Sequence, residues 1–204
     1  MKYTNFLDDI LGQKSKLKAL RFLSVFKKEV SIRELSREIK ITPPNLSIIL
    51  NDLEEQGALV GQQIGTSIVY TLNEGHFLVD EIIKPLFKKE SGSRSELAEK
   101  IKKSVNLSYD SLILFGSIAR GEEHSQSDID LAVIINDKSD ASDAEAKILE
   151  FNPAIARKFG NSLSPVVIKR SDFIERFKKK DKLILEIAKE GILIAGKSIS
   201  ELII

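Results

Sequence analysis

Residues 114–133 read LFGSIARGEEHSQSDIDLAV, and this stretch decides how the second half of the chain is interpreted. An apolar run ends at Gly116-Ser117, and after ten intervening residues Asp128 and Asp130 open the next apolar run. Side chains two positions apart in a strand point to the same face, so the two carboxylates should converge. Converging carboxylates repel each other and are costly to bury. We therefore expect a cation between them.

The residue types in this stretch suit one kind of cation. Mg²⁺ or Mn²⁺ is typically bound through one or two carboxylates and keeps waters or substrate phosphate oxygens as its other ligands. Gly116 lets a phosphate approach the backbone closely, and the backbone N–H groups and the Ser117 hydroxyl can hold its oxygens. The two motifs together predict a site for a metal-bound triphosphate, which is most of what phosphoryl-type transfer requires.

The spacing of these motifs resembles the signature of the DNA-polymerase-beta-like nucleotidyltransferase superfamily, and the longer text FGSIARGEEHSQSDIDLAV is similar to its minimal nucleotidyltransferases. The resemblance covers about residues 96–204. It implies Mg²⁺-dependent transfer of a nucleoside monophosphate from an NTP, with ATP as the expected donor, to a hydroxyl, with release of pyrophosphate. It also implies residue roles: catalysis by Ser117, Asp128 and Asp130, metal binding by the two aspartates, and nucleotide binding by Gly116, Ser117, Arg120 and Ser127.

One part of the superfamily pattern is missing. Its transferases generally use a third acid on a later strand, but the corresponding stretch NSLSPVVIKR (161–170) contains none. A general base contributes roughly 10²–10⁴-fold to the rate, so two interpretations stay open. The protein is an enzyme, or it is a transcriptional regulator whose nucleotidyltransferase-like domain binds nucleotide without catalysis. Arg120 also has a second interpretation, as a solvated loop residue paired with Glu122 or Glu123.

Strands alternate with helices from Glu96 onward, which predicts an α/β (α+β) domain with a mixed sheet. The stretches SLILF, DIDLAVII and SPVVIK are the expected strands. Helices are expected before the first strand, over residues 140–160, and after the third strand.

The first part of the chain has the order of a winged helix-turn-helix. A helical period runs over residues 15–28, a second helix follows its cap at Ser31, and a third begins at Pro43 and stops at Gly57. Alternating residues around a Gly65-Thr66 turn then predict a two-stranded hairpin. The predicted organisation is a winged helix-turn-helix domain at 1–75, a connecting helix and linker at 76–95, and the nucleotidyltransferase-like domain at 96–204.

In winged helix-turn-helix proteins the second helix of the motif enters the major groove of DNA. This mapping predicts six DNA-binding residues: Arg33, Arg37, Thr42, Asn45, Ser47 and Asn51. The helix PPNLSIILNDLEEQ has no arginine or lysine and carries acids, so protein interaction is the rival use of the domain. We also expect a homodimer, which would double a weak electrostatic attraction to DNA.

Composition limits the remaining possibilities. The chain has 204 residues, with 31 Lys+Arg against 30 Asp+Glu, so it has no overall polybasic or acidic character. The absence of cysteine excludes disulfides, thiolate zinc sites and a cysteine nucleophile. No apolar run approaches the roughly 18–20 residues of a membrane span, and the N-terminus lacks a signal-peptide pattern, so we expect a cytoplasmic protein that does not associate with membranes.

The resemblance to minimal nucleotidyltransferases further suggests a HEPN-type protein partner with an acceptor tyrosine.

Overall fold

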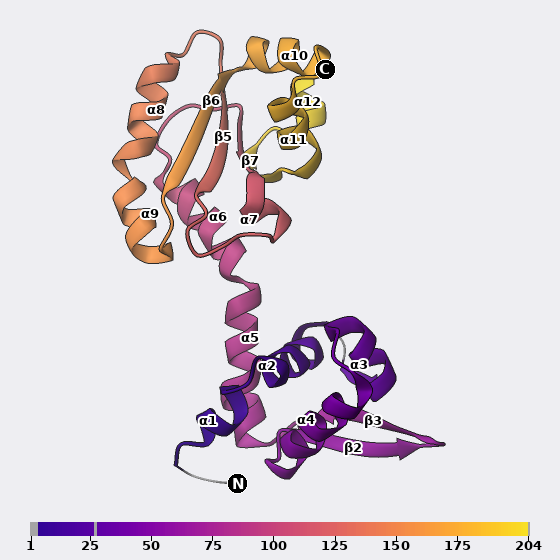
Figure 1. The fold of residues 1–204 in the computed structure, drawn as a ribbon. Coiled ribbons are helices and arrows are strands. Elements are labelled where there is room, and N and C mark those ends of the chain that lie inside the picture. The colour runs from indigo at the N-terminus through magenta and orange to yellow at the C-terminus, as the bar shows by residue number, and fades with distance from the viewer. Residues whose placement is uncertain (1–3, 27, 204) are drawn as a thin grey trace. The chain divides into compact units, whose positions relative to one another are not determined.

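The computed structural model describes residues 4–26 and 28–203, and the chain forms two compact units, 1–93 and 94–204 (Figure 1). The elements of the first unit are α1 (Phe6–Leu11), α2 (Lys14–Arg21), the π-helical η1 (Phe22–Phe26), β1 (Glu29–Ser31), α3 (Ile32–Ile39), α4 (Pro43–Glu55), β2 (Leu59–Ile64), β3 (Ser67–Leu72), the π-helical η2 (Leu78–Ile83) and α5 (Lys84–Ser91).

The predicted local signals of the first unit are present in the structure. The Ser31 hydroxyl accepts a hydrogen bond from the Glu34 N–H at 3.3 Å and so caps α3. Gly57 adopts a left-handed φ of 80° just after α4, and Gly65 a φ of 61° at the tip of the hairpin. β1 pairs with β3 and gives the sheet order β1-β3-β2. The three predicted helices and the hairpin are therefore confirmed as elements, although the first helix continues as a π-helix after Arg21.

The segment predicted to connect the two domains packs into the first unit. Leu78, Val79, Ile83 and Phe87 are buried in the same core as the apolar faces of α3 and α4. The last residues of the predicted connecting helix and linker, 91–95, are mostly helical, because α5 ends at Ser91 and the next helix begins only two residues later. Burial of these apolar side chains explains why the first unit extends to residue 93.

The second unit alternates strands and helices. Its elements are α6 (Ser93–Ser104), β4 (Ser111–Leu114), α7 (Gly116–Arg120), β5 (Ile129–Ile135), α8 (Ala141–Glu150), α9 (Asn152–Phe159), β6 (Leu163–Lys169), α10 (Arg170–Lys178), α11 (Lys182–Glu190), β7 (Ile192–Gly196) and α12 (Ile199–Ile203).

Within the described residues these strands form a sheet in the order β6-β5-β4-β7. β5 and β6 run parallel, whereas the β4·β5 and β4·β7 pairs are antiparallel. The predicted mixed sheet is confirmed. The sequence did not predict β7, because its five residues ILIAG fit a helix as well as a strand. The helix predicted over 140–160 is two helices, and Pro153 lies in the first turn of the second.

The two faces of this sheet are covered by different helices (Figure 1). Leu131, Val133 and Ile135 of β5 pack in one cluster with side chains of α6, α8 and α9. Ala132 and Ile134 pack in the other, with side chains of α10, α11 and α12. Asp130 shares the face of Ala132 because side chains alternate along a strand. It therefore projects at the start of β5, on the side covered by α10–α12.

No helix in the described parts of the chain combines the length and apolarity that crossing a bilayer would require.

Candidate active site

The backbone of Gly116 lies directly against the carboxylate of Asp130. A Cβ atom added at Gly116 would stand 2.1 Å from Oδ2 and 2.9 Å from Cγ of Asp130. The Phe115 N–H donates to the Asp130 carbonyl at 3.0 Å, which fixes the two chain segments side by side. Gly116 also has a φ of 70°, a left-handed value that favours glycine. The bend after β4 and the start of β5 thus meet at this point.

Asp128 and Asp130 are close enough to influence each other electrostatically. Burial raises the pKa of the half-buried Asp130, the negative charges of Asp128 and Glu186 raise it further, and the positive charge of Arg120 opposes them. Asp128 is exposed, in the loop just before β5. Neither carboxylate forms a hydrogen bond or ion pair with another residue that the structure describes. The pair carries a repulsion that no protein cation relieves by direct contact.

These two carboxylates could hold a divalent cation that takes few of its ligands from the protein. No group of three or more His, Cys, Asp or Glu side chains is arranged to hold a metal ion within residues 4–26 and 28–203. A two-carboxylate donor set suits Mg²⁺, which commonly completes its octahedral shell with water and substrate phosphate oxygens. The residues present therefore fit a metal that arrives with, or is completed by, a phosphate ligand.

The two serines of the motif have different environments. The hydroxyl of the half-buried Ser117, in α7, makes no hydrogen bond to a described residue. The Ser127 hydroxyl accepts a hydrogen bond from the His124 N–H at 2.8 Å, and the Asn161 side-chain amide donates to the Ser127 carbonyl at 2.7 Å. Ser127 thus stabilises the turn that leads into Asp128, while the Ser117 hydroxyl is available to a ligand.

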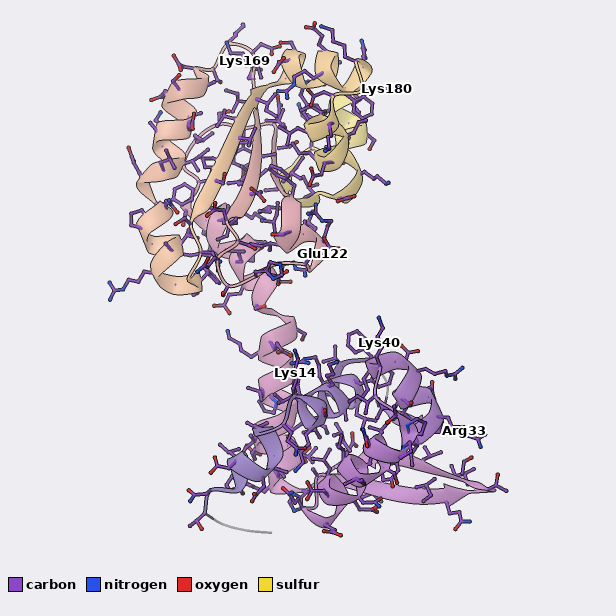
Figure 2. The ribbon with its side chains drawn as sticks, viewed as in Figure 1. Lys14, Arg33, Lys40, Glu122, Lys169 and Lys180 are labelled. Carbon is purple, nitrogen blue, oxygen red and sulfur yellow. The ribbon has the colours of Figure 1, made fainter. Side chains whose placement is uncertain are left out.

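Arg120 is held by three carboxylates. Its guanidinium bonds to Glu122 at 2.9 Å, Glu186 at 2.6 Å and Glu190 at 3.2 Å, and Figure 2 shows Glu122 beside α7. These hydrogen bonds, that of Glu122 first, raise the pKa of Arg120. The pairing with Glu122 agrees with the second interpretation of Arg120. The pairing of Arg120 with Glu186 and Glu190 of α11 could not be predicted from the sequence. The only sequence signal was that these two acids lie one helical turn apart.

The strand beside β5 adds no acid on the face of Asp130. In the parallel register Asp130 lies opposite Ser164, and Ala132 lies opposite Val166. Partners in register on neighbouring strands share a face of the sheet. The structure therefore places a serine where an acid on β6 would stand next to Asp130.

Residues 96–200 match the protein family described as polymerase beta, nucleotidyltransferase. The chain belongs to this family. The match spans the whole sheet of the second unit together with the Gly116 bend and both aspartates. No match was found among curated proteins.

Several solved structures resemble parts of the chain. Reduced HlyU from Vibrio cholerae N16961 is 22% identical, with a TM-score of 0.34 over 41% of this chain and 78% of that one. The antimony-specific transcriptional repressor AntR is 19% identical, with a TM-score of 0.37 over 47% and 78% of the two chains. A toxin–antitoxin structure with AMP-PNP is 18% identical, with a TM-score of 0.34 over 52% and 76%. Membership of the nucleotidyltransferase family rests on the family match, not on these likenesses.

The predicted DNA-binding residues of this nucleotidyltransferase-family protein lie on α3, on α4 and at the residue just before α4. Arg33 and Arg37 are exposed on α3 and have no ion pair with a described residue; Arg33 is at the outer surface of its unit (Figure 2). Thr42 precedes α4 as its N-cap residue. Asn45 is exposed and Ser47 half-buried in the first turns of α4.

Asn51 and Asp52 of α4 make side-chain contacts within the first unit. The Asn51 side-chain oxygen accepts a hydrogen bond from the buried Tyr70 hydroxyl at 3.0 Å. Asp52 pairs with the buried Lys16, which lowers the pKa of Asp52. Ile48, by contrast, is 70% exposed on the same helix. The outer face of α4 therefore presents an apolar side chain without a basic one.

Proposed function

We propose that this protein is a Mg²⁺-dependent nucleotidyltransferase that moves a nucleoside monophosphate from an NTP to a hydroxyl. The observation that supports the proposal most strongly is the juxtaposition of Asp130 with Gly116. A carboxylate without a protein partner lies against a backbone bend that has no side chain, and Asp128 adds a second negative charge. Such a place suits a cation and a phosphate together.

Each residue of the motif has a role in this proposal. Asp128 and Asp130 would hold the metal, which when bound stabilises charge on the attacking and leaving oxygens. The Gly116 backbone and the Ser117 hydroxyl would hold phosphate oxygens of the NTP. Ser127 supports the loop that carries Asp128. Arg120 would contact phosphate only by giving up part of its bonding to the three glutamates.

The test is pyrophosphate release from labelled ATP, with Mg²⁺ and candidate hydroxyl acceptors. We expect release by the wild type, and none above background from a protein with both Asp128→Asn and Asp130→Asn. Glu123→Gln is the matched control, because it removes one exposed negative charge from the same loop and should leave release unchanged. Equal release by the double variant and the wild type would contradict the proposal.

A second candidate function is a nucleotide sensor without turnover. It is favoured by the register of β6, which puts Ser164 and not an acid beside Asp130. The same assay separates the two candidates, because a sensor binds ATP in a Mg²⁺-dependent manner and releases no pyrophosphate with any acceptor.

We also propose that the first unit is a winged helix-turn-helix domain that binds DNA through α3 and α4. The exposed Arg33 and Arg37 support this use. Protein interaction is the alternative, favoured by the exposed Ile48. We also keep as proposals the domain boundaries 1–75, 76–95 and 96–204, a homodimer and a HEPN-type protein partner.

A further inference from the structure

One end of the second unit carries an excess of positive charge. Residues 169–182 contain seven Lys+Arg and three Asp+Glu, a net of +4, whereas the whole chain has a net of +1. Lys169 pairs with the last residue of β5, whereas Asp130 is the second residue of that strand. Figure 2 shows Lys169 and Lys180 at one end of this unit and Glu122 toward the other. The positive end is therefore separate from the candidate active site.

The acids near α10 are engaged in local bonds. Asp172 and Asp181 pair with Arg176, and Asp181 also caps α11. Glu175 pairs with a lysine one turn further along α10. Asp137, in the loop after β5, accepts a backbone N–H from the first turn of α10 at 2.9 Å. These negative charges are used to fix the local structure.

Five exposed lysines at this end have no ion pair with any residue that the structure describes: Lys138, Lys169, Lys178, Lys180 and Lys182. We refer to them as the α10 lysines. Lys138 lies in the loop bonded to the start of α10, and Lys169 is the N-cap residue of that helix. The other three lie at its carboxyl end and in the turn into α11. The nine residues of α10 span about 14 Å, so unpaired cations stand at both ends of the helix.

Lys180 has a backbone conformation that favours glycine. It adopts a left-handed φ of 58° just past the end of α10, where glycine is usual because an L side chain is strained there. Its N–H completes the helix end by donating to the Phe177 carbonyl at 3.0 Å. The chain thus carries a cation where glycine would fold with less strain. This favours a role for the cation outside folding.

The surroundings of the α10 lysines indicate which partner they suit. No large hydrophobic side chain is exposed within residues 169–182, since Phe173 is buried and Phe177 half-buried. Protein interfaces are enriched in aromatic residues and depleted of lysine. Membrane-surface helices insert Trp, Phe or Leu, and proteins that bind single strands stack bases on aromatic rings. Lysines without such anchors suit the phosphate backbone of a duplex, which they contact without reading sequence.

We propose that the α10 lysines form a DNA-binding surface on the second unit, which holds the phosphates of a duplex without sequence specificity. The choice of DNA over duplex RNA rests on the proposed function, in which the first unit binds DNA. Each lysine that contacts a phosphate releases counterions and adds about 0.9 to the slope of log K against log salt.

The first test locates the contact. The isotope-labelled full chain carries Arg33→Ala and Arg37→Ala, which remove the contacts proposed for the first unit, and a short random-sequence DNA duplex is added at low salt. We expect the assigned NMR signals of the α10 lysines to shift, and those of Lys189, at the other end of α11, to stay unchanged. Unchanged signals at α10 would overturn this inference and leave DNA binding by the first unit standing. Shifts with duplex RNA or phosphatidylserine vesicles, but not with DNA, would overturn the choice of partner.

The second test measures affinity by fluorescence anisotropy as a function of salt. Lys178→Ala with Lys182→Ala should reduce the slope of log K against log salt by about 1.8. The matched control is Lys103→Ala with Lys189→Ala, which removes the same charge from exposed positions in the last turns of α6 and α11 and should leave the slope unchanged. Equal slopes for the two double variants would overturn the inference.

The third test separates charge from folding at Lys180. Because glycine relieves the left-handed strain, Lys180→Gly should raise the melting temperature while it reduces the salt slope by about 0.9. A more stable variant with an unchanged slope would show that this cation does not contact DNA. A lower melting temperature would overturn the argument from strain.

Discussion

Gly116 is constrained in two independent ways. Its left-handed φ of 70° would cost another residue about 1–2 kcal/mol. A Cβ at this position would also overlap the Asp130 carboxylate and would lie 3.2 Å from the Asp130 Cβ, which belongs to strand β5. The second constraint bears on the proposed function, because any side chain here would push the Asp130 carboxylate away from the backbone bend that is proposed to hold a phosphate.

Gly116→Ala tests both constraints against a matched glycine. Gly160 has a φ of 86° and open space around its missing Cβ, so Gly160→Ala should lower the free energy of unfolding by only about 1 kcal/mol. Gly116→Ala adds the overlap and should cost roughly 2–4 kcal/mol, and it should also abolish Mg²⁺-dependent ATP binding. Chemical denaturation and calorimetric titration measure the two effects. Equal stability of the two variants, with ATP binding retained, would contradict this account.

At the scale of elements, the sequence pattern was sufficient to predict strands whose buried residues form one continuous apolar run. β5 and β6 are apolar runs bounded by loop residues, so their existence and the mixed sheet could be predicted. β7 could not, because five apolar residues do not distinguish a strand from a helix. The salt bridges from Arg120 to α11 join residues that are 66 and 70 positions apart, and a single sequence gives no signal for such pairing.

The parallel register of β5 and β6 makes a prediction of its own. Ser164→Asp would place a third carboxylate next to Asp130. Without metal, the added repulsion should lower the free energy of unfolding by about 1 kcal/mol, the energy of two unit charges about 4 Å apart in water. Mn²⁺ should raise the melting temperature of this variant more than that of the wild type, because an added ligand strengthens binding to the folded state.

Ser139→Asp is the control for this register, since Ser139 lies in the loop after the far end of β5. Thermal unfolding is measured with a chelator and then with Mn²⁺. The rise in melting temperature caused by Mn²⁺ should be no larger for the control than for the wild type. If the Mn²⁺-induced shift of Ser164→Asp equals that of Ser139→Asp, either the register or the metal site is wrong.

At the scale of the whole molecule, charge is nearly balanced. The complete chain has a formal net charge of +1. Residues 1–75 contain ten Lys+Arg and nine Asp+Glu, again a net of +1. Phosphate neutralisation supplies most of the non-specific affinity of proteins for DNA. If the first unit binds DNA as proposed, the binding must depend on local cations and not on an overall positive field.

The exposed Arg33 and Arg37 are the local cations that α3 offers. We expect weak, salt-sensitive binding of the wild type to a short random-sequence duplex, measured by fluorescence anisotropy between about 50 and 200 mM salt. Replacing both arginines by alanine should weaken binding and reduce the slope of log K against log salt by about 1.8, because each phosphate contact contributes about 0.9. Lys28→Ala with Lys88→Ala removes the same charge from exposed sites outside α3 and α4 and should leave the slope unchanged. Equal losses in the two double variants would mean that α3 does not contact DNA, and the exposed Ile48 would then favour a protein partner for this unit.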